Sequence, residues 1–319
     1  MRFAIFGVGA IGGYFGGRLA QAGEDVVFIA RGDTLRALRS TGLRLTSISG
    51  DFLLSPVNAV EDPNPVGTVD VVLLGVKTWQ VPEAAEAVRP LVGPDTIVLP
   101  LQNGVEAATQ LAEVLGGGHV CCGLAKIFCY LAEPGHVQHS GIDPYIALGE
   151  CDNRRTERIR ELRGILQQAG IRAEIPSDIA AALWEKFLFV ASWGGIGAVS
   201  RAPIGVLRAM PGTRRMLEQA MREILNVARA RNIDLQEDIV ARSMGFIDSL
   251  PPAGTTSMQR DIAEGRPSEI DAWNGAVVRF GAEAGVDVTL HRFIYDSLLP
   301  LELNARGEIS LFGSEFNIS

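Results

Sequence analysis

The stretch RFAIFGVGAIGGYFGGRLAQAG, residues 2–23, decides the fold of this chain. Its first part, Arg2–Phe6, is a short apolar run, which is typical of a buried strand. The glycines that follow have the spacing GxGxxG, and Ile11–Ala22 then has the pattern of a helix that ends at Gly23. A strand, a glycine-rich turn and a helix in this order predict the first unit of a parallel α/β sheet.

Each glycine of the motif has a separate physical task. Gly7 permits the tight turn after the strand, Gly9 lets the backbone approach a pyrophosphate, and Gly12 lets the helix pack against the strand. Ala10 and Ile11 would then offer the backbone N–H groups of a helix N-terminus to the phosphates. With strand and helix on either side, the motif predicts a dinucleotide cofactor; a glycine-rich turn without a ligand is the alternative.

Strands and helices continue to alternate after this first unit. Apolar runs predict strands at Val26–Ala30, Val69–Val76 and Thr96–Leu101, with a helix near Pro82–Leu91. Leu43–Val60 is expected to be a small β insertion. The alternation is typical of a parallel sheet that is covered by helices on both faces.

The pattern changes in the second half of the chain. Between Val120 and Ile175 it is less regular, and from Pro176 onward helical periodicity dominates. We therefore expect a dinucleotide-binding Rossmann-type domain at residues 1–175 and an all-helical substrate domain at residues 176–319. The shorter elements expected after Val120 are strands at Val137–His139 and Tyr145–Leu148 and helices at Arg155–Ala169, Ala181–Ala191, Thr213–Arg231 and Glu269–Gly281.

Composition excludes several classes of protein. The 319 residues carry a formal net charge of −8, so no basic surface predicts nucleic acid as a partner. We see no signal peptide and no apolar run of membrane-spanning length.

His136 and His139 lack an evident third ligand, so no metal is expected. The cysteines are expected to be reduced thiols of a cytoplasmic protein, and a homodimer is left open. They are Cys121, Cys122, Cys129 and Cys151.

The residue after the second strand bears on the choice between NAD and NADP. A carboxylate at this place bonds the ribose hydroxyls, whereas an arginine accommodates the 2′-phosphate of NADP. Arg31 stands at the strand end, and its guanidinium can hold a phosphate with two parallel hydrogen bonds. NADP(H) is therefore expected, although Asp33 could act as the carboxylate instead.

Polar residues in apolar surroundings are the candidates for chemistry. Lys77 and Asn103 follow predicted parallel strands, at the edge of the sheet where ligands bind. Lys186 lies in an apolar helical stretch and could act as a general acid, although a lysine at a helix edge that extends its ammonium to water is the simpler reading. Ser257 and Glu269 flank a polar stretch, and the carboxylate of Glu269 is also explained by the dipole of the helix it begins.

The chain resembles the ketopantoate reductase (2-dehydropantoate 2-reductase) family. The resemblance extends over almost the whole chain, in the same order, and the last stretch is the most specific. The matching stretches are GVGAIGGYFGGRLAQAG, Arg31, VKTWQ around Lys77, PLQNGV around Asn103, PGHVQHSG at Pro134–Gly141, LWEKFLF around Lys186 and TSMQRDIAEGRPSEID at Thr256–Asp271.

The resemblance implies reduction of 2-dehydropantoate to pantoate by NADPH, a step of pantothenate biosynthesis. By match, Lys186 is the general acid, Glu269 positions it or the substrate hydroxyl, and Ser257 binds the substrate carboxylate. Asn103 and Lys77 line the site near the nicotinamide. The glycines of the motif and Arg31 bind the cofactor, and Glu269 also lies near it.

This chain departs from the family pattern on the helix of Lys186. The family usually carries Asn one and two turns after this lysine, where this chain has Val190 and Gly194. Both positions are expected to face the substrate, because residues four apart share a helix face. An NADPH-dependent reductase of a different 2-keto acid is therefore an alternative, and a non-catalytic NADP-sensing protein is a second one.

Overall fold

The computed structural model describes residues 1–311, which belong to two compact units. The first unit is Met1–Ala182 and the second begins at Leu183. The boundary expected after residue 175 thus lies a few residues further on, inside the long helix α6 (Ile179–Ser200). Apart from Glu185 and Lys186 this helix is largely apolar on both sides of the boundary, so its pattern does not mark the change of unit.

The first unit is organised around a parallel sheet of five strands in the order β5-β2-β1-β6-β7. β1 lies between β2 and β6 and pairs with both in parallel register, so the chain crosses over on either side of it. This is the strand order of a dinucleotide-binding half, and it confirms the predicted Rossmann-type sheet. The strands are β1 (Arg2–Phe6), β2 (Asp25–Ile29), β5 (Ala59–Val60), β6 (Val69–Leu74) and β7 (Val92–Pro100).

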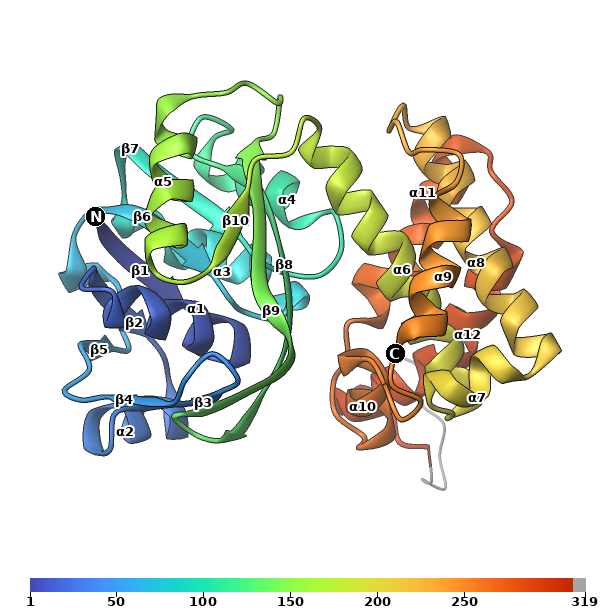
Figure 1. Cartoon of the computed structure of the whole chain (residues 1–319), viewed down its shortest axis with the longest axis horizontal. Coiled ribbons are helices and arrows are strands. Elements are labelled where there is room, and N and C mark those ends of the chain that lie inside the picture. Colours follow the sequence, from blue (N-terminus) through green and yellow to red (C-terminus); the bar gives the residue numbers. More distant parts are fainter. Residues whose placement is uncertain (312–319) are drawn as a thin grey trace. The chain divides into compact units, whose positions relative to one another are not determined.

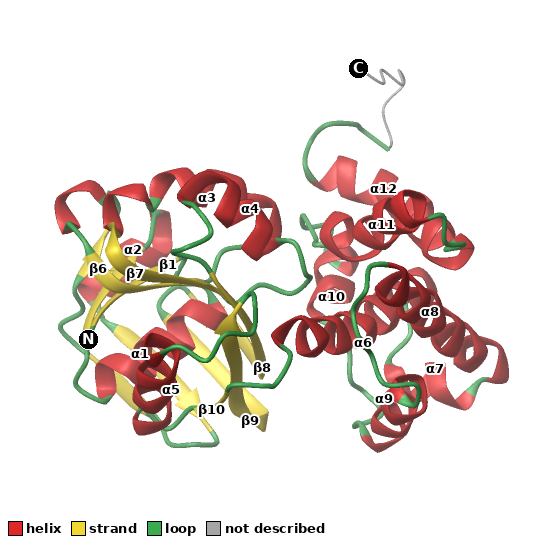
Figure 2. Cartoon of the chain, turned by 90° about the horizontal axis from the view of Figure 1, so that it is seen from above, coloured by secondary structure: helices red, strands yellow, loops and turns green. Residues whose placement is uncertain are grey.

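Helices cover both faces of this sheet (Figure 2). Alternate residues of β1 divide between the faces: Ala4 packs with one apolar cluster, while Phe3 and Ile5 pack with the other. The first cluster lies under α3 and α4, and the second contains Phe15 and Leu19 of α1. The helices are α1 (Ala10–Gln21), α2 (Gly32–Ser40), α3 (Val81–Ala87), α4 (Ala107–Leu115) and α5 (Glu157–Gln168).

A second sheet lies against α1 and α5 in the same unit (Figures 1 and 2). Its order is β10-β9-β3-β4, with β8 paired to β9. The region expected to be irregular is in fact a long antiparallel hairpin, because the two short predicted strands are parts of the single strand β9. The strands are β3 (Leu43–Ser47), β4 (Phe52–Leu54), β8 (Cys121–Glu133), β9 (His136–Glu150) and β10 (Arg172–Glu174).

The hairpin also changes the expectation about cysteines. Cys122 and Cys151 form a disulfide with a Cα–Cα distance of 5.2 Å, so the expectation of four reduced thiols is wrong for this pair. They are 29 residues apart in sequence, and only the pairing of β8 with β9 brings them together. Cys121 and Cys129 are free, and burial raises the pKa of each thiol to about 12.

The second unit consists of helices throughout its described residues, and the chain has no strand after β10 up to residue 311 (Figure 1). This confirms the all-helical expectation. The predicted helix at Glu269–Gly281 begins as a π-helical turn, Asp271–Gly275, and continues as α11. The helices after α6 are α7 (Ile204–Ala209), α8 (Pro211–Ala230), α9 (Ile239–Ser249), α10 (Ser257–Ala263), α11 (Ala276–Ala284) and α12 (Thr289–Ala305).

α6 is longer than the helix expected at Ala181–Ala191, and its length bears on the expectation that no apolar run could span a membrane. By length and composition alone it could cross a membrane, although no membrane-length run was expected. The core helix of a globular unit passes the same test. Phe187, Leu188 and Ile196 of this helix are almost fully buried, and its apolar character is explained by that packing.

Candidate functional site

The glycine-rich loop has the conformation that its motif requires. Gly7 has φ +91°, and a Cβ at this position would lie 2.6 Å from Cγ1 of Val76. A Cβ on Gly12 would lie 2.1 Å from the carbonyl oxygen of Gly7, so only glycine allows α1 to pack this closely. Around Gly9, by contrast, a Cβ would meet nothing within 4 Å. The loop is therefore tightly packed at its ends and open in the middle.

The open position lies at the N-terminus of α1. Gly9 is the N-cap residue and no side chain caps the helix, so the N–H groups of the first turn, which includes Ala10 and Ile11, lack a side-chain acceptor there. Uncapped N–H groups beside an open glycine form a natural anion site. The residues present thus fit the pyrophosphate of a dinucleotide.

The segment after β6 packs closely against the glycine loop, and the loop after β7 is joined to that segment by Gln102, a residue that the sequence analysis did not single out. A Cβ on Gly75 would lie 2.8 Å from the carbonyl oxygen of Gly7, so the end of β6 approaches the loop closely. The side chain of Gln102 donates hydrogen bonds of 3.0 Å to the carbonyls of Leu74 and Val76. Gln102 stands next to Asn103 in the stretch PLQNGV, and this position was the signal in the sequence that could have identified it.

These contacts place two predicted site residues at one edge of the sheet. Lys77 lies in the loop after β6, beyond Gly75 and Val76, and Asn103 lies in the loop after β7; hydrogen bonds from Gln102 join the two loops. The Nζ atom of Lys77 lies 5.8 Å from the ring centre of Trp79. This edge is the carboxyl end of neighbouring parallel strands, where ligands of open α/β sheets bind.

Arg31 and Asp33 differ in what they contact. Asp33 forms an ion pair with Arg36 one turn further along α2. Arg31 is the N-cap residue of α2, its side chain is 69% exposed, and its partner Glu83 is 3.8 Å away and 76% exposed. A pair this exposed contributes at most about 1 kcal/mol and is easily exchanged for another anion. Arg31 is thus the group that can turn to a phosphate.

In the second unit the predicted catalytic helix carries Lys186 and Val190, both half-buried, and Gly194, which is buried. A Cβ on Gly194 would lie 2.7 Å from Cζ3 of Trp273 and 3.1 Å from Cε of Met258. Side chains of the same unit thus cover Gly194, and its expected contact with substrate stays a prediction. The space of a side chain at this position is filled by Trp273.

The contact at Gly194 brings three site segments together. Met258 follows Ser257, the first residue of α10, and the N–H of Trp273 donates to the carbonyl of Glu269 over 3.0 Å. The side chain of Glu269 is buried, with 5% exposed. The packing of α6, α10 and the π-helical turn therefore gathers the segments that carry Lys186, Ser257 and Glu269, which are far apart in sequence.

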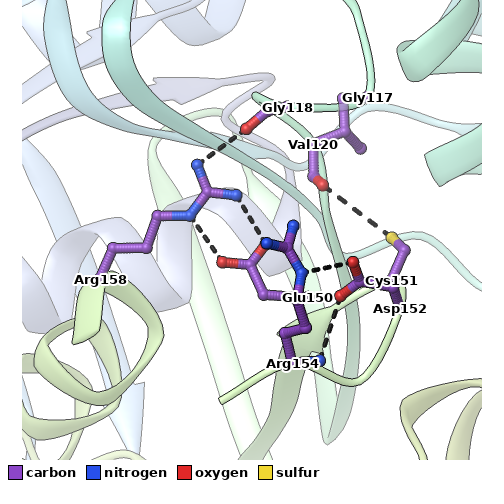
Figure 3. A pocket seen from close by; sticks show the side chains of 8 residues that line it. All are labelled: Gly117, Gly118, Val120, Glu150, Cys151, Asp152, Arg154 and Arg158. Atoms are coloured by element: carbon purple, nitrogen blue, oxygen red, sulfur yellow. Dashed lines mark hydrogen bonds and ion pairs between the residues drawn. The ribbon is translucent and has the colours of Figure 1, made fainter. Parts of the chain in front are cut away.

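A pocket of about 200 Å³ lies elsewhere in the first unit and contains none of the predicted site residues (Figure 3). Its charges already pair: Arg158 donates to Glu150 at 2.6 and 2.7 Å and to the carbonyl of Gly118 at 2.8 Å. Burial opposes ionisation of Glu150, but the hydrogen bonds from Arg158 and Thr156 lower the pKa of its carboxyl group. With these groups paired, the pocket is structural. Its lining is Gly117, Gly118, Val120, Glu150, Cys151, Asp152, Arg154 and Arg158.

Among residues 1–311 no group of three or more His, Cys, Asp and Glu side chains could hold a metal ion. The two histidines considered from the sequence have other partners. His136 lies 3.0 Å from Oγ1 of Thr46, and the imidazole of His139 bonds Ser47 and the carbonyl of Ile142. Both histidines thus take part in the packing of the second sheet.

Comparison with known proteins agrees with the division of the chain into two units. The family model described as "Ketopantoate reductase PanE/ApbA" matches residues 3–153, and its C-terminal counterpart matches residues 178–302. A 2-dehydropantoate 2-reductase of Nostoc sp. is 30% identical over 97% of this chain and 98% of the relative.

Solved structures extend the likeness to the whole fold. A PanE/ApbA family ketopantoate reductase from Ralstonia eutropha JMP134 has a TM-score of 0.88 and 34% identity, covering 96% of this chain and 100% of that one. A D-mandelate dehydrogenase, solved with NADH and anilino(oxo)acetate, has a TM-score of 0.88 over 96% of this chain and 100% of that one. At 22% identity this second likeness concerns the fold alone.

Proposed function

The chain belongs to the ketopantoate reductase family and is an oxidoreductase, and from this premise we propose that it reduces 2-dehydropantoate to pantoate with NADPH. The reaction would be a step of pantothenate biosynthesis in the cytoplasm. The observation that carries the proposal is the packing at Gly194, which gathers the segments of Lys186, Ser257 and Glu269 in one helical unit.

The glycine loop fits a nicotinamide dinucleotide, and this cofactor, when bound, supplies the hydride. Gly9 leaves space for the pyrophosphate, and the uncapped N-terminus of α1 offers N–H groups to it. Arg31, weakly paired and exposed, would hold the 2′-phosphate of NADPH. Lys77 and Asn103 would lie beside the cofactor at the carboxyl edge of the sheet.

Three residues of the helical unit would act on the substrate. The hydroxyl group of Ser257 binds the carboxylate of the 2-keto acid and fixes its orientation. As the ketone carbon accepts hydride, negative charge develops on the ketone oxygen, and the ammonium of Lys186 stabilises it and transfers a proton to it. The carboxylate of Glu269 holds Lys186 or the product hydroxyl in place. One hydride and one proton convert the ketone to the alcohol.

A second candidate substrate class follows from the apolar surface after Lys186. Val190 offers no hydrogen bond to a substrate hydroxyl, and at Gly194 the indole of Trp273 fills the space of a side chain. A fold shared with a D-mandelate dehydrogenase does not by itself select the substrate. A 2-keto acid without the hydroxyl of 2-dehydropantoate is therefore the alternative.

The test is oxidation of NADPH and of NADH by the purified protein with a panel of 2-keto acids that includes 2-dehydropantoate and α-ketoisovalerate. We expect turnover with 2-dehydropantoate and a higher kcat/KM with NADPH than with NADH. Turnover confined to other 2-keto acids would favour the second candidate. Tight binding of NADPH without turnover of any keto acid would favour the NADP-sensing alternative and contradict the proposal.

A further inference from the structure

The residue before Glu269 is held by a buried carboxylate from the last helix. Glu302 of α12 is 4% exposed, and it accepts three hydrogen bonds from Ser268, which is 1% exposed. The N–H of Ser268 donates to both carboxylate oxygens, at 2.8 and 3.1 Å, and its hydroxyl donates at 2.6 Å. Two donors of one residue therefore converge on one carboxylate.

An arginine completes this arrangement. Arg306 follows α12 and pairs with Glu302 at 2.6 Å, and its guanidinium also donates to the carbonyl of Ser268 over 3.4 Å. The N–H, hydroxyl and carbonyl groups of Ser268 are thus all bonded to the Glu302–Arg306 pair. Because one carboxylate accepts from both the serine and the arginine, its charge is compensated inside the unit.

This contact determines where Glu269 can lie. The carbonyl of Ser268 belongs to the peptide bond that leads into Glu269, and the hydroxyl of Ser268 accepts a hydrogen bond of 3.3 Å from the N–H of Ile270. The backbone is therefore fixed on both sides of Glu269. Its own carbonyl accepts from Trp273 and fixes the start of the π-helical turn.

From this geometry we propose that Glu302 is a positioning residue: it acts through Ser268 to hold the carboxylate of Glu269 in the position that the reaction requires. This inference rests on the proposed function of Glu269. A carboxylate suits the task better than an amide, because it accepts from the serine N–H, the serine hydroxyl and the guanidinium at once. The NH2 group of an amide can only donate, so it could not accept a hydrogen bond from any of these three donors.

The test uses the full-length Glu302→Gln variant, which keeps the side-chain volume. Displacement of a catalytic group by about 1 Å costs up to about 100-fold in rate, so we expect kcat to fall between tenfold and 100-fold with an unchanged Kd for NADPH. If Glu269 no longer supports the charged form of Lys186, the alkaline limb of the kcat profile moves to lower pH.

A double-variant cycle separates positioning from stability. If Glu302 acts through Glu269, adding Glu302→Gln to Glu269→Gln lowers kcat little further, although each change lowers Tm on its own. Glu223→Gln is the matched control, since Glu223 is a buried carboxylate of α8 that accepts from the N–H groups of Leu290 and His291. It should lower Tm without moving the pH profile.

Hydrogen exchange keeps this inference separate from the proposed function. In Glu302→Gln the amides of residues 266–275 should exchange faster, whereas Glu223→Gln should affect residues 288–293, whatever substrate the enzyme uses. Failure of the wild type to reduce any 2-keto acid contradicts the proposed function, and the exchange data still decide whether Glu302 orders the segment.

Two results would overturn the inference: unchanged exchange at residues 266–275, or a folded Glu302→Gln variant with wild-type kcat and an unshifted pH profile. If Glu302→Gln does not fold, Ser268→Ala decides the question. It removes only the hydroxyl group and should change kcat, the pH profile and exchange in the same direction but by less.

Discussion

Lowering the pH should destabilise the helical unit through a single buried histidine. His291 of α12 is fully buried; its Nε2 atom lies 3.0 Å from the carbonyl of Ala220, and its Nδ1 atom lies 2.9 Å from Nδ2 of Asn274. The carbonyl needs a donor and the amide needs an acceptor, so the ring fits this place only when neutral. Burial lowers the pKa of His291 from 6.5 to about 4, against the opposing effect of the Ala220 carbonyl.

The sign and size of the effect follow from that shift. Below the unfolded pKa of 6.5 the unfolded chain takes up a proton that the folded chain refuses, so stability falls as the pH falls toward about 4. At about pH 5 the loss amounts to about 2 kcal/mol, since one pKa unit corresponds to about 1.4 kcal/mol.

The assay is urea unfolding followed by tryptophan fluorescence, because three of the four tryptophans, Trp184, Trp193 and Trp273, belong to the helical unit. The variant His291→Gln cannot titrate. The stability gap between wild type and variant should shrink by about 2 kcal/mol between about pH 7.5 and pH 5. His136→Gln, in the other unit, controls for the loss of a histidine as such. A gap that stays constant with pH would refute the reasoning.

Three further predictions concern the site. Arg31→Ala should weaken NADPH binding by about 1.5–3 kcal/mol and leave NADH binding nearly unchanged, because only NADPH has the 2′-phosphate; the control Arg36→Ala removes an arginine that already pairs with Asp33, and equal losses for both cofactors would disprove the assignment. Lys186→Ala should lower kcat by about 10²–10⁴-fold with little change in the Kd for NADPH, and near-wild-type turnover would mean that another group donates the proton. Val190→Asn should raise the kcat/KM preference for 2-dehydropantoate over α-ketoisovalerate by about 1–3 kcal/mol, and an unchanged preference would show that this position does not contact the substrate hydroxyl. Gly194→Asn should chiefly lower Tm, since its Cβ would lie 2.7 Å from Trp273.

Local signals determined much of the first unit. The run Arg2–Phe6 and the glycines after it predicted β1, the turn and α1 almost to the residue, because a buried parallel strand and a phosphate loop each impose their pattern over a few neighbouring residues. The helical periodicity of Thr213–Arg231 likewise predicted α8 (Pro211–Ala230) within two residues. Elements whose geometry depends only on residues close in sequence could thus be predicted from the sequence.

The sequence was less informative where partners are distant along the chain. The hairpin of β8 and β9 appeared as two short strands, and the Cys122–Cys151 disulfide was not expected, since both depend on pairing across many residues. The end of the Lys186 helix was also missed: its pattern was followed only to Ala191, whereas α6 continues to Ser200 through glycines that its neighbours require.

By itself the sequence predicted the residue types of the proposed site: the glycine loop, Arg31, and the lysine, serine and carboxylate of the helical half. Only the tertiary structure decided what surrounds them. It packs Trp273 against Gly194, joins the loops of Lys77 and Asn103 by hydrogen bonds from Gln102, and brings Glu302 into hydrogen-bond contact with Ser268. The physical reason is that residue type and spacing report contacts within a few residues, whereas tertiary packing joins residues that no regular spacing relates.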